Sequence, residues 1–477
     1  MTRTSYFPAP GVHPAQVPSP AARSRPYDAA AARDHLWLHF TPHATSTPYF
    51  RGVTRAEGHH FWTSEGQKVF DGLSALFAVN VGHGRARLAD AAARQLRELD
   101  FFPVWNHAHP AAAELAAALA ERAPGDLNRV FFTNSGSEAV ETAWKLAKQY
   151  FKAVGQPTRH KVVSRALAYH GTTQGALSIT SIPAVKAPFE PLVPSTSRVP
   201  TTDWFRAAPD FDGDEEAFGR WSADRIAEAI ELEGPETVAA IFLEPLQNSG
   251  AAIPPPPGYF QRVREIADRY GVLLVADEVI TAFGRLGEFF AIERYGVVPD
   301  IITGAKGLTS GYVPAGLVLA SDRLFEPFAS GRHTFLHGLT FAGHPLAAAV
   351  ALENIAVFEE EGLNAHVRTH EDTFAARLGA AAADSPLLGT VRGAGFFQAV
   401  VLSAEAGRPT PFEPATQRRL VDELLLPGLA ERGLYARIDE RSLPAILLAP
   451  PLTIGEAEID LLATTVADVL DESWRRL

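Results

Sequence analysis

The sequence predicts an α/β protein with a parallel or mostly parallel sheet in a large domain, followed by a smaller α+β domain. Two observations lead to this prediction. From about residue 129 to residue 321, short runs of Val, Ile, Leu and Phe recur without polar alternation, which is typical of parallel strands covered on both faces. Helix-length segments such as YFQRVREIADRY, which precedes GVLLVADEV, separate several of these runs.

The composition limits the classes of function. A chain of 477 residues is long enough for two or three domains and a large core. Its net charge of −12 disfavours nucleic acids and anionic membranes as partners, because both attract basic surfaces. No apolar run approaches the roughly 18 residues of a membrane span. The absence of cysteine excludes disulfides, thiolate metal ligands and cysteine nucleophiles, and it is compatible with a cytoplasmic protein.

Changes in composition suggest four segments. Residues 1–27 are rich in Pro, Ala and Ser and are predicted to form a disordered tail. Residues 28–82, with a short helix in DHLWLHFTP and a meander in GHHFWTSEGQKVFDGLSALFAVNVGHG, are expected to join the small domain. Residues 83–345 form the predicted large domain, and residues 346–477 form the small one.

The elements follow in order along the chain. RLADAAARQLREL and PAAAELAAALAERA place apolar residues at i, i+3 and i+4, which predicts helices. The predicted strands of the large domain are RVFFTN, HKVVSRA, TVAAIFLEP, GVLLVADEV, DIITGAK and AGLVLAS. VRGAGFFQAVVL and PAILLAPPLTI predict strands in the C-terminal segment.

Polar residues follow several of these strands. In open α/β sheets, ligands bind where the strands finish at their carboxyl ends. The residues at those ends are Ser135-Gly136-Ser137, Tyr169-His170-Gly171, Glu244, Asp277-Glu278 and Lys306. We therefore expect an acid, a lysine, an aromatic ring and a glycine-serine turn to meet at one edge of the sheet.

Lys306 stands out in a chain that otherwise prefers arginine. It is the only lysine after Lys186, and small residues precede it in TGAKG. A lysine in a desolvated site has a depressed pKa and becomes an amine nucleophile, which arginine cannot do. The pattern favours a catalytic amine over a surface lysine.

Three other groups fit an anionic, planar ligand. Ser135 and Glu138 form a capping-box pattern, so the helix that follows offers free N–H groups to an anion, or is an ordinary cap. Tyr169 could stack on a planar ring or lie in the core. Asp277 needs a cationic or donor partner, such as a protonated ring nitrogen or a structural ion pair. It is not expected to chelate a metal with Glu278, because successive strand residues face opposite sides.

Together these motifs resemble the class III, fold-type I pyridoxal 5'-phosphate (PLP) aminotransferases, in particular the ω-amino acid:pyruvate branch. The resemblance covers about residues 35–470. It is carried by TNSGSEAVETAWKLAK, AYHGTTQGALSIT, FLEPLQ, LLVADEVITAFGRLG, DIITGAKGLTSGYVPAG, HGLTFAGHPLA, VRGAGFF and APPLTI. It implies the fold-type I architecture, with a seven-stranded sheet in the large domain.

The resemblance also implies PLP as the cofactor. Lys306 is then the residue that binds PLP as a Schiff base and acts as the catalytic base, and Asp277 is the partner of the ring nitrogen. Tyr169 and Val279 are expected on the two ring faces, with His170 beside Tyr169.

The remaining cofactor contacts follow from the same resemblance. Ser135, Gly136 and Ser137 are expected to bind the phosphate, and Glu244 is expected near the cofactor's hydroxyl group. Thr340 resembles a threonine that reaches the phosphate bound by the partner subunit. This implies a homodimer with shared active sites, or a tetramer built from such dimers.

The substrate residues are predicted from the segment LYARIDERSLPAILLAPPLTI and from three aromatic residues. An arginine guanidinium can bind a keto-acid carboxylate through two hydrogen bonds. Both Arg437 and Arg441 are candidates, and Arg437 is favoured because it directly follows the apolar start of a predicted strand. Phe40, Trp62 and Phe77 are candidate pocket walls. EPLQNSGA also departs from the more common glycine-rich version of this motif at Asn248 and Ser249.

The predicted reaction is a ping-pong transamination. An ω-amino acid or primary amine, such as β-alanine or taurine, gives its amino group to PLP and then to pyruvate. The alternative within the same cofactor class is a 2,1-aminomutase or a decarboxylase. A non-catalytic binding protein is disfavoured because Lys306 and Asp277 are both present, and no metal is expected.

Overall fold

The computed structural model describes residues 27–41 and 52–477. They belong to two units. Unit 1 comprises the described residues up to Arg55 together with Trp62–Gln67, and unit 2 comprises Ala56–Phe61 and Lys68–Leu477. Apart from Tyr27, the predicted tail of residues 1–27 lies outside the described residues. The other predicted domain boundaries stay predictions.

The N-terminal helix lies earlier than its predicted position. Helix α1 (Ala29–His35) begins after Asp28, whose carboxylate accepts a hydrogen bond of 2.9 Å from the N–H of Ala31. The expectation of a helix that starts at DHLWLHFTP is wrong, because α1 ends one residue after this stretch begins. The run of four alanines after an aspartate cap explains the difference, since alanine favours helix and aspartate favours its N-cap. The predicted meander contains the short strands β2 (His60–Thr63) and β3 (Lys68–Asp71), and β1 (Val53–Glu57) lies just before it.

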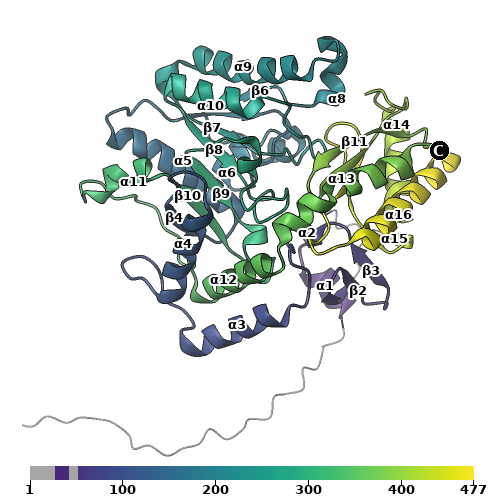
Figure 1. Ribbon diagram of the computed structural model, residues 1–477, viewed down its shortest axis with the longest axis horizontal. Helices are drawn as coiled ribbons and strands as arrows, with labels where there is room; N and C mark the ends of the chain where they lie inside the picture. Colours follow the sequence, from purple (N-terminus) through teal and green to yellow (C-terminus); the bar gives the residue numbers. More distant parts are fainter. Residues whose placement is uncertain (1–26, 42–51) are drawn as a thin grey trace, which may run out of the picture. The chain divides into compact units, whose positions relative to one another are not determined.

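Unit 2 is built on a seven-stranded sheet with the order β4-β10-β9-β8-β7-β5-β6 (Figure 1). Strands β5 to β9 run parallel to one another, and β10 is antiparallel to β9 and β4. The strands are β4 (Arg129–Thr133), β5 (Lys161–Arg165), β6 (Thr196–Val199), β7 (Val238–Leu243), β8 (Leu273–Asp277), β9 (Ile301–Gly304) and β10 (Gly316–Ala320). The prediction of a mostly parallel sheet is confirmed. Strand β6 was not predicted, because TSRV has a single apolar residue.

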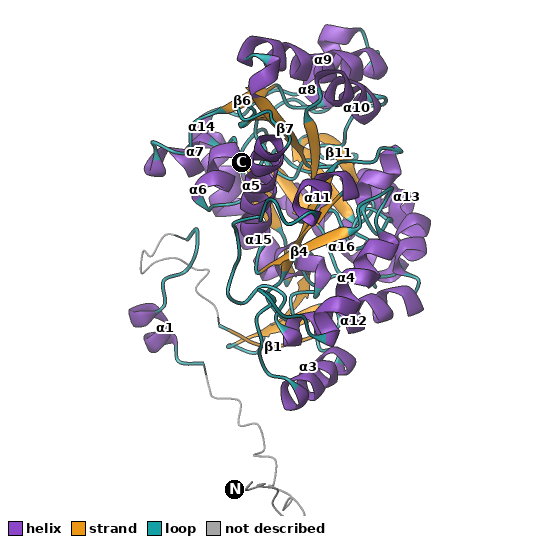
Figure 2. Ribbon diagram, turned by 90° about the vertical axis from the view of Figure 1, so that its left-hand side faces the viewer, coloured by secondary structure: helices purple, strands orange, loops and turns teal. Residues whose placement is uncertain are grey.

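Burial of both faces explains the unalternated apolar runs. All six residues of β7 are buried. Val238, Ile241 and Leu243 join one hydrophobic cluster, and Ala239, Ala240 and Phe242 join a second one. Helices surround the strands in Figure 2. Those of this region are α2 (Ser74–Phe77), α3 (Ala86–Glu98), α4 (Pro110–Arg122), α5 (Gly136–Ala153), α6 (Gln174–Ile179), α7 (Pro183–Lys186), α8 (Trp204–Ala207), α9 (Glu215–Glu233), α10 (Tyr259–Tyr270), α11 (Asp322–Ala329) and α12 (Pro345–Glu360).

The C-terminal part contains a second, antiparallel sheet with the order β11-β12-β15-β14. Its strands are β11 (Leu388–Ala394), β12 (Phe397–Leu402), β14 (Arg437–Asp439) and β15 (Ala445–Leu448), and β13 (Leu434–Tyr435) pairs in parallel with β3. The helices here are α13 (Leu363–Ala382), α14 (Pro414–Arg418), α15 (Leu426–Glu431) and α16 (Glu456–Arg476), of which α13 and α16 pack against each other (Figure 1).

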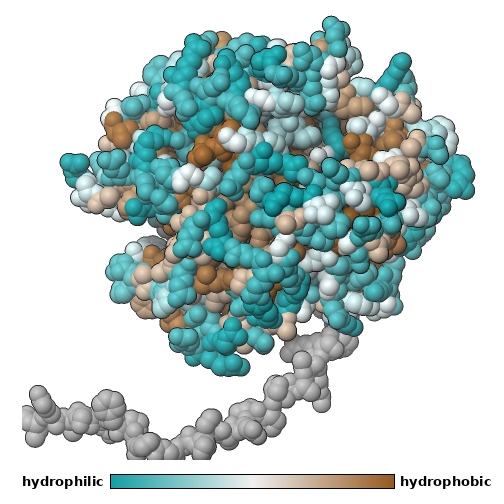
Figure 3. All heavy atoms as spheres, in the orientation of Figure 1, coloured by the Kyte–Doolittle hydropathy of each residue, from teal (hydrophilic) through white to brown (hydrophobic). Residues whose placement is uncertain are grey.

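Hydrophilic side chains cover most of the face seen in Figure 3, and apolar ones form separate patches between them. Within the described ranges, no helix combines the length and apolar character needed to cross a membrane.

Candidate functional site

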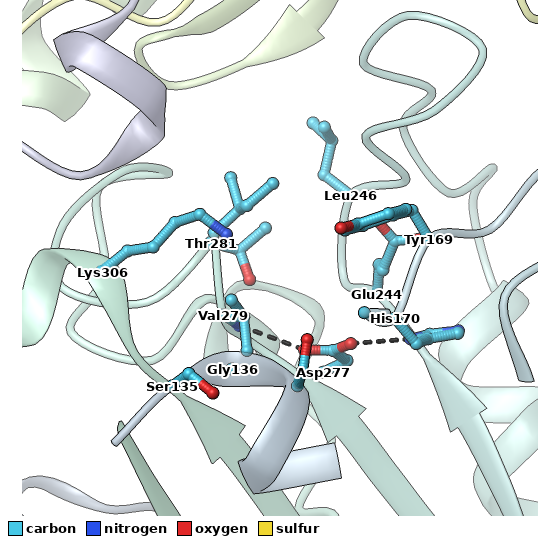
Figure 4. Close-up of a pocket in the computed structure, with 13 residues that line it drawn as sticks. Ser135, Gly136, Tyr169, His170, Glu244, Leu246, Asp277, Val279, Thr281 and Lys306 are labelled. Carbon is cyan, nitrogen blue, oxygen red and sulfur yellow. Dashed lines mark hydrogen bonds and ion pairs between the residues drawn. The ribbon is translucent and has the colours of Figure 1, made fainter. Parts of the chain in front are cut away.

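One cavity lies beyond the carboxyl ends of β5, β7, β8 and β9 (Figure 4). It brings together nine of the predicted site residues. They are Ser135, Gly136, Ser137, Tyr169, His170, Glu244, Asp277, Val279 and Lys306. Parallel strands finish at the same sheet edge, so residues as much as 171 positions apart in sequence converge there.

Asp277, the last residue of β8, lies at the floor of the cavity. His170 Nδ1 donates a hydrogen bond of 2.6 Å to Asp277 Oδ2, and Oδ1 accepts bonds from Thr303 Oγ1 (3.0 Å) and Val279 N (3.2 Å). These donors fix the carboxylate beside the cavity. The carboxylate of Glu278 instead accepts bonds from Ala291 N (2.9 Å) and Ile292 N (2.7 Å) in the loop that follows.

Lys306 enters the cavity from the side opposite Tyr169 and Leu246 (Figure 4). Its amine has no hydrogen-bond or ion-pair partner among residues 27–41 and 52–477. Burial lowers the pKa of Lys306 to about 8, although Asp277 and Glu244 partly oppose this effect. Arg437 lowers the same pKa further by charge repulsion. The site thus contains a lysine that gives up its proton more readily than an ordinary lysine, so a larger fraction of it is neutral at a given pH.

The N-terminus of α5 forms another wall. Ser135 Oγ accepts a bond of 3.3 Å from Glu138 N, while Glu138 Oε2 accepts one of 2.7 Å from Asn134 N rather than from the cap residue itself. The N–H groups of Gly136 and Ser137 have no acceptor within the described part of the chain. Free N–H groups at the start of an 18-residue helix favour an anion.

Glu244 and Tyr169 line the side of the cavity toward β7. Glu244 Oε2 accepts a bond of 3.0 Å from Asn248 N, and Oε1 is buried without a hydrogen-bond partner among the described residues. Burial raises the pKa of Glu244, and the charges of His170 and Arg165 oppose that rise. Burial likewise raises the pKa of Tyr169, and the charges of Arg441 and Arg437 act against it. Both guanidinium groups are therefore close enough to influence the cavity.

The two candidate arginines have different surroundings. Arg441 Nη1 donates a bond of 2.7 Å to Ser249 Oγ and lies 3.4 Å from Asp439 Oδ2. The guanidinium of Arg437 has no hydrogen-bond or ion-pair partner within the described residues, and burial and Arg441 both lower its pKa.

Six predicted site residues do not line the cavity: the two arginines just described and four others. Phe77 is buried, with its ring 5.2 Å from that of Phe397. Thr340 is exposed. Phe40 is 76% exposed and Trp62 stacks under Arg55 at 4.3 Å, both in unit 1. Their functional roles stay predictions.

Gly171, expected at the end of β5, also lines the cavity, whereas three other lining residues were not predicted, namely Leu246, Ile280 and Thr281. Each lies within four residues of a predicted site residue, so widening the search by one turn beyond each strand would have found them. Gly171 has φ of 130°, and a Cβ at this position would lie 2.4 Å from Ser137 Oγ. This glycine therefore lets the β5–α6 loop approach α5 closely.

Comparisons with known proteins agree with this geometry. The family model described as aminotransferase class-III matches residues 41–470. A probable aminotransferase of Mycobacterium tuberculosis is 52% identical over 97% of this chain and 99% of its own length. A putrescine–pyruvate aminotransferase of Pseudomonas aeruginosa is 38% identical over 93% of this chain and 96% of its own. An (S)-enantioselective omega-transaminase from Thermomicrobium roseum superposes with a TM-score of 0.87 at 38% identity, covering 93% of this chain and 98% of that one. The chain belongs to the class III aminotransferases, a PLP-dependent family of fold type I.

Proposed function

We propose that this aminotransferase moves the amino group of a primary amine or an ω-amino acid to pyruvate. The unpartnered guanidinium of Arg437 beside the cavity is the observation on which the proposal rests, because a keto acid brings a carboxylate that needs such a partner. The relative named for putrescine and pyruvate supports a primary amine as donor and pyruvate as acceptor. β-Alanine and taurine are further candidate donors.

The groups around the cavity complement those of PLP. The free amine of Lys306 suits the aldehyde carbon, and the carboxylate of Asp277 suits the protonated ring nitrogen. The unpaired N–H groups of Gly136 and Ser137, with the hydroxyls of Ser135 and Ser137, suit the phosphate. Tyr169 and Val279 would contact the two ring faces, and Glu244 would lie near the ring hydroxyl.

The chain's own residues then divide the chemistry. PLP supplies an electron sink for the charge that develops on the substrate carbon next to nitrogen. Lys306 Nζ accepts the proton from that carbon and returns it, a task suited to an amine with a pKa of about 8. His170 orients the Asp277 carboxylate, so that this charge stays beside the ring nitrogen.

Arg437 binds the carboxylate of pyruvate. Its guanidinium is free and lies near Lys306 and Tyr169, whereas Ser249 and Asp439 hold Arg441. The planar guanidinium group of arginine binds a carboxylate through two parallel hydrogen bonds. An amine donor without an acid group leaves Arg437 without a substrate partner.

A second copy of the chain completes the enzyme. Exposed apolar residues gather on the loops around Thr340: Phe102, Trp105, Leu336 and Phe341 are 45%, 68%, 81% and 60% exposed. Gly338 lies against the Trp105 ring, which joins the two loops into one patch. A partner that covers this patch would bring its Thr340 to the phosphate end of the site.

A panel of donors tests the proposal. Wild-type holoenzyme is given pyruvate with β-alanine, taurine, putrescine, γ-aminobutyrate or a benzylic amine, and alanine formation is measured. At least one donor should give alanine together with an equal amount of aldehyde or ketone. Arg437→Ala should raise KM for pyruvate far more than for an uncharged donor. Carbon dioxide or an isomerised amine without alanine would instead indicate the decarboxylase or aminomutase alternative.

A further inference from the structure

A closed loop connects the cavity wall to the C-terminal sheet. Paired backbone bonds between Gln247 and Ile253, of 3.0 and 2.9 Å, close the loop, and its residues are buried. Glu244 and Leu246, at its root, line the cavity. Ala251 and Ala252 have φ of 78° and 46°, a left-handed region costly for residues other than glycine. A backbone held in this conformation needs strong external contacts.

Two arginines of the C-terminal part supply these contacts. Arg392 on β11 donates to Ala251 O (2.8 Å) and to Gly250 O, and it pairs with Asp203 at 2.5 Å. Arg441 donates to Ser249 Oγ at 2.7 Å. Ser249 has no exposed surface, so this hydroxyl is a fixed acceptor.

Arg441 is held from a second side as well. Asp439 has a fully buried side chain; its Oδ1 accepts the backbone N–H of Arg441 at 2.9 Å, and its Oδ2 lies 3.4 Å from Arg441 Nη1. The side-chain contacts of Arg441 with Ser249 and with Asp439 both use Nη1. Neither Nε nor Nη2 of Arg441 has a partner within the described residues. Arg441 thus has unused N–H donors, and its charge acts on Tyr169, whose ring lines the cavity.

We propose that Ser249 and Asp439 are acceptor-selecting residues, because holding Arg441 against the 247–253 loop leaves the keto acid the guanidinium of Arg437, which has no partner among the described residues. This inference rests on the transamination to a keto acid proposed above. The two arginines and Asp439 together hold one net positive charge, which matches one carboxylate. A second carboxylate cannot draw Arg441 toward it while Ser249 and Asp439 hold that side chain through Nη1, and Glu244 and Asp439 repel the carboxylate.

Releasing Arg441 should therefore widen the choice of acceptor. In Ser249→Ala, the guanidinium loses its hydroxyl partner and can turn its unused donors toward a second carboxylate. The ratio of kcat/KM for 2-oxoglutarate to that for pyruvate should rise about tenfold, the effect of gaining one charged hydrogen bond. KM for pyruvate should stay close to that of wild type, because Arg437 is unchanged.

Three further variants make the test specific. Ser249→Ala combined with Arg441→Gln should lose the gain. Asp439→Asn should raise the same ratio independently, in case Ser249→Ala does not fold. Ser442→Ala is the matched control, since Ser442 Oγ accepts a comparable bond of 3.1 Å from Arg206 one position away from Arg441. Its acceptor ratio should equal that of wild type.

An unchanged ratio in both Ser249→Ala and Asp439→Asn overturns the inference, and so does a gain that survives Arg441→Gln. The amine half-reaction, measured on the same holoenzymes without any keto acid, separates this result from the proposed function. If wild type fails to consume amine, the proposed function falls and takes the inference with it. A normal half-reaction with an unchanged acceptor ratio overturns the inference alone.

Discussion

Lys306 combines an unusual backbone with an unusual side-chain environment. Its φ is 45°, a left-handed value that costs energy in any residue except glycine. The following Gly307 cannot be enlarged, since a Cβ there would lie 2.4 Å from Asn80 Nδ2. The surrounding chain thus fixes the lysine in a backbone conformation that it would rarely adopt alone.

The lowered pKa of Lys306 gives a pH dependence with a definite sign. Only the neutral amine attacks a carbonyl carbon, and its fraction rises as pH increases through the pKa. In protein stripped of cofactor, the rate at which Lys306 captures added PLP should rise up to about pH 8 and then level off. An ordinary lysine would show a rise that continues to about pH 10.4. Borohydride trapping followed by mass spectrometry of the Lys306 peptide measures the rate, and a midpoint near pH 10 would contradict the burial argument.

For single residues, the sequence predicts the chemical role of a side chain better than the direction in which that side chain points. Lys306 is recognisable because it is the sole lysine of the last 291 residues in an arginine-rich chain. The packing of Phe77 on Phe397 cannot be recognised in the sequence, because it depends on a left-handed backbone at Ser74, Ala75 and Phe77 itself. No local pattern in SALF predicts three such residues.

Among the elements, the start of α5 has the tightest requirement. A Cβ at Gly136 would lie 2.6 Å from Val279 Cγ1 across the cavity wall. Gly136→Ala should therefore displace Val279, destabilise the fold by about 1–3 kcal/mol and weaken PLP binding. Calorimetry and a fluorescence titration with PLP measure the two effects.

Gly379 in α13 provides the control for this substitution. It sits inside a helix, and a Cβ added there would have no atom within 4 Å. Gly379→Ala should stabilise the protein by roughly 0.5–1 kcal/mol and leave PLP affinity unchanged. Equal stability and equal PLP affinity of the two variants would show that the contact between Gly136 and Val279 is unimportant.

Strands are predictable from sequence wherever burial on both faces removes polar alternation, as in β7 and β8. Strand β6 and helix α1 show where this signal stops. The residues TSRV of β6 are mostly polar and do not predict a strand; they form one because they pair with β5. The 247–253 loop is recognisable in the sequence only as a departure from a glycine-rich motif, because its conformation depends on Arg392 and Arg441, more than 140 residues away.

For the whole molecule, the exposed patch around Trp105 predicts self-association. Wild type should be a dimer or larger at micromolar concentration, and Trp105→Asp should shift it toward monomer and release PLP. Leu232→Asp, at an 88% exposed site at the end of α9, is the control and should not change the assembly. Light scattering after gel filtration gives both masses. A monomeric wild type that retains PLP would contradict the shared active site.

The amine half-reaction of Lys306→Ala tests the central assignment most directly. Wild-type holoenzyme mixed with a primary amine alone should lose the absorbance of bound PLP, gain that of the pyridoxamine form and release one carbonyl product per cofactor. Lys306→Ala, loaded with PLP, should make this conversion about 10²–10⁴-fold more slowly, because the proton transfer loses its base. A conversion at nearly the wild-type rate would contradict the role of Lys306.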